Sequence, residues 1–142
     1  MIQVVVDASI ALAWCFPDET SDYAAGILVS LEGKTVLVPA IWSLEIANAI
    51  LAGQRRKRLN QPEIKEFTTL LENLSLAQDV RPVASHVNDV LPLAHKHGLL
   101  AYVAAYLELS IRLNAPLATL DGKLQKAARL AGIPLFVGEA GK

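Results

Sequence analysis

The apolar positions of the chain fall into short continuous runs separated by longer segments with helical spacing. The first run, Ile2–Val6, is rich in β-branched residues, as is typical of a strand buried on both faces of a parallel sheet. The other runs are similarly short and are bounded by polar or glycine-containing segments. The predicted strands are Ile2–Val6, Val36–Val38, Asp79–Val83, Leu117–Leu120 and Leu135–Val137.

The segments between these runs carry the start and stop signals of helices. Asp18–Ser21 offers N-cap chemistry for one helix, Pro39 suits a first helical turn, and Gly98 and Gly132 suit helix ends. The predicted helices are Ala8–Trp14, Tyr23–Leu31 ending at Gly33, Pro39 to about Arg55, Gln61 to about Asn73, Ser85–His95 with Ser85 as cap, Ala101–Leu113, and Lys123–Ala131. This alternation predicts an α/β three-layer sandwich with a central, mostly parallel sheet flanked by helices.

Three acidic residues stand where a globular domain has no need of charge. Asp7 ends the first apolar run, Asp121 follows Pro116–Leu120, and Glu45 interrupts an apolar stretch. Lone acids beside buried strands are costly unless they are paired or hold a cation, and parallel sheets bind ligands at the carboxyl ends of their strands. Each acid also has an ordinary explanation, because Asp7 and Asp121 can cap helices and Glu45 can lie on a helix surface. We favour the joint interpretation, a single cation site.

Composition adds bounds to this interpretation. The chain has 142 residues, 53% of them hydrophobic and 19% charged, which predicts one folded domain spanning residues 1–142. The net charge of −1 excludes a general polycation, so nucleic-acid binding needs a local patch. The dense basic run is Arg55, Arg56, Lys57 and Arg58, with a sparser face at Lys123, Lys126 and Arg129. The run can equally be a solvated helix C-terminus, where cations offset the helix dipole.

The remaining chemistry-bearing residues favour ordinary roles. Cys15 is the single cysteine, which rules out an internal disulfide and fits a reducing cytoplasmic location. It has no visible base partner, so we expect it to pack in the core. We expect solvated histidines at His86, His95 and His97, no signal peptide and no membrane span.

Three segments, taken in order, resemble the motifs of a known family. Asp7–Ser9 follows a strand, Glu45–Ala49 lies on an apolar helix, and Leu117–Leu124 joins a strand to a helix. Together they resemble the PIN domain, especially the compact VapC-like toxin ribonucleases of toxin–antitoxin pairs. The resemblance implies metal-binding and catalytic acids at Asp7, Glu45 and Asp121, steadied by Ser9, Asn48 and Thr119. It also implies Mg²⁺ or Mn²⁺ as cofactor, RNA as substrate, a cognate antitoxin protein as partner, and a homodimer.

A fourth motif departs from the family pattern. Gly98–Ala104 resembles the segment that carries a further acid, but Val103 occupies the acidic position and Leu100 the small polar one. These two positions lie one turn apart on one helical face. Losing one electrostatic stabiliser lowers rates about a hundred- to a thousandfold.

Two functions therefore remain open. One is a weakened metal-dependent endoribonuclease, and the other is an inactive PIN domain that binds RNA or a protein. For either, the apolar segments 8–23 and 61–73 are the expected surface for a dimer partner or an antitoxin helix.

Overall fold

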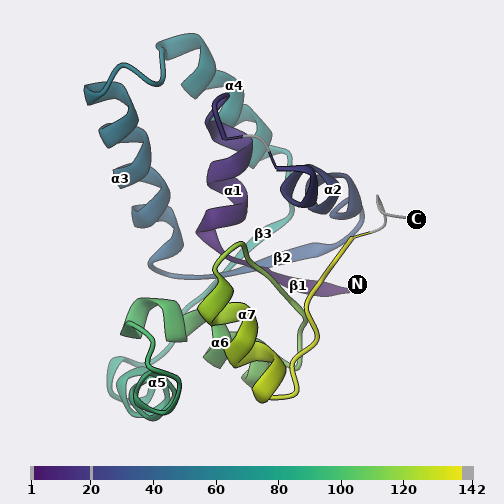
Figure 1. Ribbon diagram of the computed structural model, residues 1–142, viewed down its shortest axis with the longest axis vertical. Coiled ribbons are helices and arrows are strands. Elements are labelled where there is room, and N and C mark those ends of the chain that lie inside the picture. Colours follow the sequence, from purple (N-terminus) through teal and green to yellow (C-terminus); the bar gives the residue numbers. More distant parts are fainter. Residues whose placement is uncertain (1, 20, 139–142) are drawn as a thin grey trace.

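The protein is organised around a four-stranded parallel sheet, seen in a computed structural model that describes residues 2–19 and 21–138. The strand order is β3-β2-β1-β4, so β1 lies inside the sheet (Figure 1). Val4, Val5 and Val6 of β1 are fully buried, as expected for a strand covered on both faces. The strands are β1 (Gln3–Val6), β2 (Thr35–Pro39), β3 (Leu76–Asp79) and β4 (Leu117–Ala118).

Helices cover both faces of this sheet and create three layers. In Figure 1, α1 to α4 lie above the sheet and α5 to α7 lie below it. The helices are α1 (Ala8–Cys15), α2 (Asp22–Ser30), α3 (Trp42–Arg55), α4 (Gln61–Glu72), α5 (Val83–His97), α6 (Ala101–Leu113) and α7 (Gly122–Leu130). The predicted α/β fold with a parallel sheet flanked by helices is confirmed.

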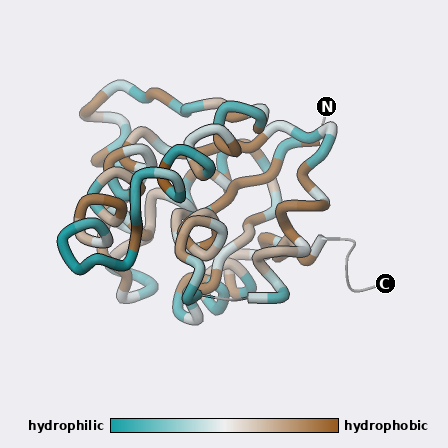
Figure 2. The backbone as a smooth tube through the Cα atoms, turned by 90° about the horizontal axis from the view of Figure 1, so that it is seen from above, coloured by the Kyte–Doolittle hydropathy of each residue, from teal (hydrophilic) through white to brown (hydrophobic). Residues whose placement is uncertain are grey.

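The apolar side chains gather between these layers. Figure 2 shows hydrophobic segments through the middle of the molecule and hydrophilic ones on many of the outer turns. The main core includes the β1 valines and the buried side chains of Ile10, Ile27, Tyr106 and Leu124. None of the helices in the described part of the chain combines the length and apolarity needed to cross a membrane.

Several helix ends follow their local sequence signals. Ser21 accepts a hydrogen bond from the Ala24 N–H at 3.1 Å and so caps α2, whereas Thr20 lies outside the described residues. Asn60 and Glu63 form a reciprocal capping box at α4. Gly98 ends α5 in the left-handed conformation, with φ 62°. The predicted bounds of α6 are confirmed.

Pro39 does not start a helix, contrary to the sequence prediction. It is the last residue of β2 and lies opposite Asp79 of β3, while α3 begins at Trp42. Proline has the fixed φ of a first helical turn, but that φ is also compatible with the end of a strand. The pairing of β2 with β3 makes Pro39 a strand residue instead of the start of α3.

The predicted position of the third strand is also wrong. It spans Leu76–Asp79 instead of Asp79–Val83, because Leu76 pairs with Val36 and the ladder ends at Asp79. Pro82 then occupies the cap position of α5, so Ser85 lies within the first turn and is not the cap. The predicted Leu117–Leu120 strand is shortened to two residues.

The predicted last strand at 135–137 is reduced to one bridge. Leu135 pairs in parallel with Leu117, and no named strand forms there within residues 2–138. The edge position next to the very short β4 gives this segment little backbone to pair with.

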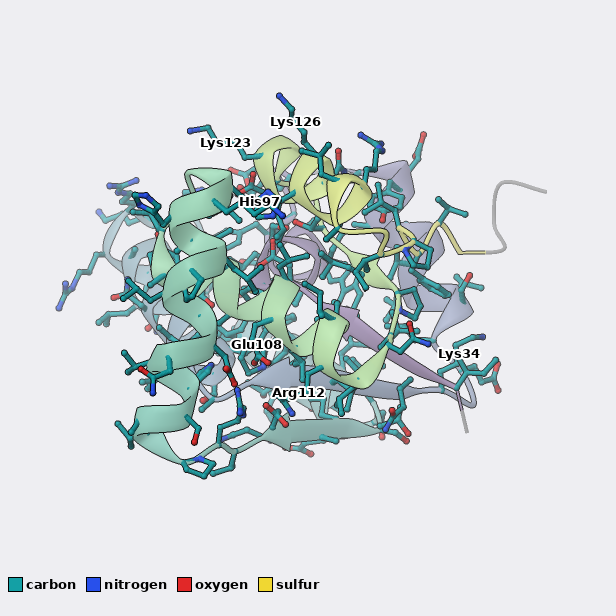
Figure 3. All side chains as sticks on the ribbon, turned by 90° about the horizontal axis from the view of Figure 1, so that it is seen from below. Lys34, His97, Glu108, Arg112, Lys123 and Lys126 are labelled. Atoms are coloured by element: carbon teal, nitrogen blue, oxygen red, sulfur yellow. The ribbon has the colours of Figure 1, made fainter. Side chains whose placement is uncertain are left out.

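An ion network around the buried Glu108 connects α6 with β3 and α5. Glu108, almost fully buried, accepts hydrogen bonds from Arg112 and lies 3.4 Å from an Arg81 nitrogen. Arg112 also pairs with Asp79, and Arg81 with Asp89 at 2.8 Å. Figure 3 shows Glu108 and Arg112 side by side on α6. These contacts hold the helix that contributes Val103 and Tyr106.

Candidate functional site

Asp7 lies at the carboxyl end of β1, where the chain turns into α1. It occupies the N-cap position, but its side chain makes no capping hydrogen bond. Its Oδ2 instead accepts hydrogen bonds from Ser9 Oγ at 2.9 Å and from Thr119 Oγ1 at 2.6 Å. The carboxylate therefore serves contacts across the sheet rather than the end of its own helix.

The two hydroxyl groups also join the ends of neighbouring strands. Ser9 Oγ accepts a hydrogen bond from the Leu120 N–H, and Thr119 Oγ1 accepts one from the Asp121 N–H, each at 3.0 Å. Because β1 and β4 are adjacent and parallel, their carboxyl ends meet at the same edge. The loop after β4 is thus tied to Asp7.

Glu45 approaches from the first turn of α3 and is partly buried. Its Oε1 accepts a hydrogen bond from the Tyr106 hydroxyl at 2.6 Å. Tyr106 is on α6 and is almost fully buried. The sequence analysis placed Tyr106 within the predicted helix Ala101–Leu113 and gave it no role at the site. A signal was present, since a buried tyrosine usually finds a partner for its hydroxyl.

Asp121 caps α7. Its Oδ1 accepts hydrogen bonds from the Lys123 N–H at 2.9 Å and the Leu124 N–H at 3.2 Å. The capping role considered for this residue is therefore present. It leaves open a second role for the carboxylate, because capping uses one of its two oxygens.

The electrostatics connect Asp7 with both other acids. Burial raises the pKa of Asp7, the hydrogen bonds from Thr119 and Ser9 oppose this, and the charge of Asp121 adds to it. Burial also raises the pKa of Glu45, which is opposed by the Tyr106 hydrogen bond and supported by the charge of Asp7. Asp7 thus lies within electrostatic reach of the other two acids, and their ionised forms repel one another. A cation would relieve this repulsion.

The acids do not form a compact ligand cluster. Across residues 2–19 and 21–138, no group of three or more histidine, cysteine, aspartate or glutamate side chains could hold a metal ion as placed. The donor chemistry still fits Mg²⁺ or Mn²⁺, because carboxylate oxygens are hard ligands and Mg²⁺ usually takes only one or two of them from protein. Asp7 and Glu45, where the charge of Asp7 acts on Glu45, are the candidates for such a set.

Three further residues singled out in the sequence lie apart from these hydrogen bonds. Asn48 is exposed on α3 and hydrogen-bonds to none of the three acids in the described structure. Val103 is partly buried and packs against the core. Leu100 is the exposed N-cap of α6 and makes no side-chain cap. Neither α6 position provides an acid.

The basic run at the end of α3 divides into two parts. Arg58 pairs with Asp18 at 2.9 and 3.1 Å and lies 4.2 Å from the centre of the Phe16 ring. Arg55, Arg56 and Lys57 are exposed. Figure 3 also shows Lys123 and Lys126 extending away from α7. Arg58 is therefore already paired with acids of its own chain, while the other cations remain at the surface.

Two adjoining grooves run over the helices above the sheet. One, of about 610 Å³, reaches from Ser9 and Leu120 at the site to Arg56. The other, of about 900 Å³, lies between α1, α2 and α4 and includes the apolar side chains of Trp14, Leu28, Val29, Phe67 and Leu70. Acidic side chains also line this second groove: Glu19, Asp22, Glu63 and Glu66.

Comparison with known proteins identifies the family of this fold and site. The sequence matches the PIN domain family over residues 4–130, which is most of the chain and includes Asp7, Glu45 and Asp121. The chain belongs to the PIN domain family. The resemblance seen in the sequence motifs is thereby confirmed at the level of the family.

Individual similar proteins match this chain over nearly their whole length. Ribonuclease VapC3 of Pyrobaculum aerophilum is 32% identical over 123 residues, which are 87% of this chain and 92% of that protein. The crystal structure of PAE2754 from the same organism has a TM-score of 0.63 at 20% identity, covering 92% of this chain and 90% of that one. That of VapBC2 from Rickettsia felis, bound to a promoter DNA fragment, has a TM-score of 0.65 at 15% identity, covering 95% and 98%. The structures share the fold, and VapC3 is a homologous ribonuclease.

Proposed function

We propose that this PIN domain is a metal-dependent endoribonuclease of the VapC toxin type. The observation that carries the proposal is the 32% identity with ribonuclease VapC3 over most of both chains. The grouping of Asp7 with Ser9, Thr119 and Asp121 at the ends of adjacent strands supports it. The sequence identity with a ribonuclease and the group of acids at the carboxyl ends of the strands together favour hydrolysis of a phosphodiester.

Asp7 and Glu45 are the residues that would hold the cation, with Asp121 beside them. A bound Mg²⁺ or Mn²⁺ supplies an activated water and neutralises charge on the phosphate. Ser9 and Thr119 hold the Asp7 carboxylate, and Tyr106 holds that of Glu45. Asn48 stays a proposed supporting residue, on the family resemblance alone.

We expect catalysis to be slower than in a PIN domain with a further acid on α6. Val103 adds neither a ligand nor a charge. Loss of one electrostatic stabiliser costs about a hundred- to a thousandfold in rate. One cation, held by few protein ligands, is the arrangement that these residues favour.

Arg55, Arg56 and Lys57 are the proposed contacts to RNA phosphates. They are exposed, and Arg56 lines the groove that begins at Ser9. Arg58 was part of this predicted set, but its ion pair with Asp18 makes it a weaker choice. Cations in such positions bind the backbone without reading the sequence of the RNA.

The groove between α1, α2 and α4 is the proposed site of a cognate antitoxin. An amphipathic helix binds such grooves through apolar side chains at helical spacing. The acids Glu19, Asp22, Glu63 and Glu66 favour basic residues around those apolar anchors. The two segments that the sequence analysis chose as a partner surface thus supply much of this groove.

A homodimer is also proposed, with α5 as its surface. Val83, Val87 and Leu91 are 81%, 56% and 63% exposed, and their four-residue spacing puts them on one helical face. A continuous apolar stripe of this kind can pack against the same stripe of a second copy about a twofold axis.

The alternative function is an inactive PIN domain that binds RNA or a protein. Val103 and the lack of a compact three-ligand cluster in the described residues favour it. It predicts the same partners but no cleavage, so the two functions separate in a single assay.

RNA cleavage with the purified chain tests the proposal. We expect slow cleavage with Mn²⁺ or Mg²⁺, none with a chelator, and none for Asp7→Asn. Glu32→Gln removes an exposed acid away from the site and should cleave like the wild type. Equal cleavage by the wild type and Asp7→Asn contradicts the assigned site, and binding of RNA without metal-dependent cleavage supports the alternative.

A further inference from the structure

Tyr106 contributes a single polar atom to the acid site from an otherwise apolar stretch of α6. Its hydroxyl donates to Glu45 Oε1 at 2.6 Å, joining α6 to the first turn of α3. The ring itself is almost fully buried. Among the described α6 side chains, Tyr106 is the one that hydrogen-bonds to any of the three acids.

The contact uses only one of the two Glu45 oxygens. No other described residue donates a hydrogen bond to this carboxylate. An ionised carboxylate has acceptor capacity on both oxygens, so Oε2 remains available to another ligand. Asp7 lies close enough for its charge to act on Glu45. Fixing Oε1 therefore limits the positions that the second oxygen can occupy relative to Asp7.

We propose that Tyr106 is a positioning residue that holds Glu45 in place for binding a divalent cation. The inference rests on the cation site of the proposed function and adds a residue that does not touch the cation. Groups that hydrogen-bond to metal ligands orient them, and removing such a group typically lowers metal affinity about 10- to 100-fold. Without the hydroxyl, Glu45 has to give up the conformational freedom of its side chain when the cation binds.

A purely structural role is the competing explanation. The same hydrogen bond joins two helices from opposite faces of the sheet, and joining them stabilises the fold whether or not a cation binds. A structural role predicts a lower melting temperature without a change in cation affinity. A positioning role predicts a loss of affinity that remains after folding has been verified.

Tyr106→Phe separates the two roles, because it removes the hydroxyl and keeps the ring. The matched control is Tyr23→Phe, whose hydroxyl donates to the Phe136 carbonyl at the same distance of 2.6 Å. Mn²⁺ affinity is measured by calorimetry on each purified variant, and folding by circular dichroism and by melting temperature in EDTA. We expect Mn²⁺ binding about 10- to 100-fold weaker for Tyr106→Phe and unchanged for Tyr23→Phe.

A second pair of variants tests whether the effect of Tyr106→Phe on cation affinity acts through Glu45. Glu45→Asp shortens the acid by one methylene, which withdraws it from the hydroxyl while Tyr106 stays in the core. We expect it to weaken Mn²⁺ binding as well. In the Glu45→Asp background, Tyr106→Phe should then have no further effect on affinity, since the interaction it removes is already absent.

The outcomes distinguish this inference from the proposed function. Wild-type Mn²⁺ affinity in folded Tyr106→Phe overturns the positioning role and leaves the proposed nuclease intact. Wild-type affinity in Glu45→Asp contradicts Glu45 as a cation ligand, and the positioning role with it. Absence of Mn²⁺ binding in the wild-type chain overturns the cation site and this inference with it. An equal loss of affinity in Tyr23→Phe would show that stability alone controls binding, and that too rejects the role of Tyr106.

Discussion

At the scale of single residues, the site keeps a buried acid, Asp7, whose ionised form lowers the stability of the fold. Asp7 is 8% exposed and keeps a carboxylate beside two other acids, a situation that burial makes unfavourable. The hydroxyls of Ser9 and Thr119 offset only part of that cost, because the net effect on the pKa is upward. A protein that needed no cation at this point would be better served by a neutral side chain.

Asp7→Asn should therefore stabilise the protein at neutral pH in a chelator. The pKa of Asp7 is higher in the folded than in the unfolded chain, so the folded state binds the proton more tightly and ionisation costs stability. Asparagine keeps an oxygen for Ser9 and Thr119 but has no charge. Melting temperatures in EDTA should be higher for the variant at pH 8, and the difference should shrink as the pH falls through the folded-state pKa of Asp7.

Glu32→Gln is the control for this comparison and should melt at the same temperature as the parent, at pH 8 and at lower pH. A lower melting temperature for Asp7→Asn in EDTA at pH 8 would show that the ionised carboxylate stabilises the fold. The burial argument would then fail.

Position 103 is the second residue at which we predict an effect on metal binding. Val103→Asp should tighten Mg²⁺ or Mn²⁺ binding, because it adds a hard oxygen ligand and a negative charge near the existing acids. Without a cation the extra charge increases repulsion, so the variant should be less stable than the parent in a chelator. Added Mn²⁺ should raise its melting temperature more than that of the parent.

Asparagine is nearly the same size as aspartate but carries no charge. Val103→Asn should therefore not reproduce the larger Mn²⁺-dependent rise in melting temperature. Equal rises for Val103→Asp and the parent would mean that this face of α6 does not point to the site. Metal binding by Val103→Asp without RNA cleavage would instead favour the binding-module alternative.

At the scale of elements, α6 is held from two sides. Tyr106 attaches it to α3 through Glu45, and Glu108 attaches it to β3 and α5 through two arginines. Glu108 is almost fully buried, so its interactions are screened less by solvent than those of a surface ion pair.

Glu108→Ala should destabilise the protein by about 1–3 kcal/mol, the usual cost of removing one partner from a buried hydrogen-bonded set. Arg81 and Arg112 would both lose an acid, although each retains an aspartate. Urea unfolding of the parent and the variant measures the difference. Glu72→Ala, at an exposed position of α4, is the control and should change stability by less than about 0.5 kcal/mol. A loss below about 1 kcal/mol for Glu108→Ala would mean that the remaining aspartates satisfy both arginines.

At the scale of the whole molecule, we propose different partners for two separate apolar surfaces. The groove between α1, α2 and α4 is bordered by acids. The α5 stripe instead carries exposed apolar side chains on three successive turns, at Val83, Val87 and Leu91. We assign the first to an antitoxin helix and the second to another copy of the chain.

Val29→Lys and Val87→Asp test these assignments and serve as controls for each other. Val29 is 71% exposed in the groove and Val87 is 56% exposed on α5, so neither change should disturb the core. Val29→Lys should weaken binding of a basic amphipathic helix, because it removes an apolar contact and repels the basic residues of the helix, without changing the oligomeric state. Val87→Asp should convert a dimer to a monomer in light scattering while helix binding is kept. A parent chain that is monomeric at high concentration would contradict the dimer.

Local sequence signals were sufficient wherever an element was decided by its own residues. The buried strand at Ile2–Val6, the helix at Ala101–Leu113 and its neighbour ended by Gly98 lie close to their predicted bounds. The same signals failed where pairing with a neighbouring strand determines the secondary structure. Pro39 is compatible with a strand end or a helix start, and only pairing of β2 with β3 made it a strand residue. The strand predicted at 135–137 had the right composition but too little edge beside it.

The sequence by itself determined the alternation of strands and helices, the family motifs, and the acids and hydroxyls worth attention. Those features are local, since periodicity, caps and motif spacing are written along the chain. The tertiary structure decided how they meet. It joined Asp7 to Thr119 across 112 positions and Glu45 to Tyr106 across 61, and it paired Arg58 with Asp18. A hydrogen bond or charge pair depends on distance in space, and spacing along a chain does not reveal that distance until the sheet has brought its strand ends together.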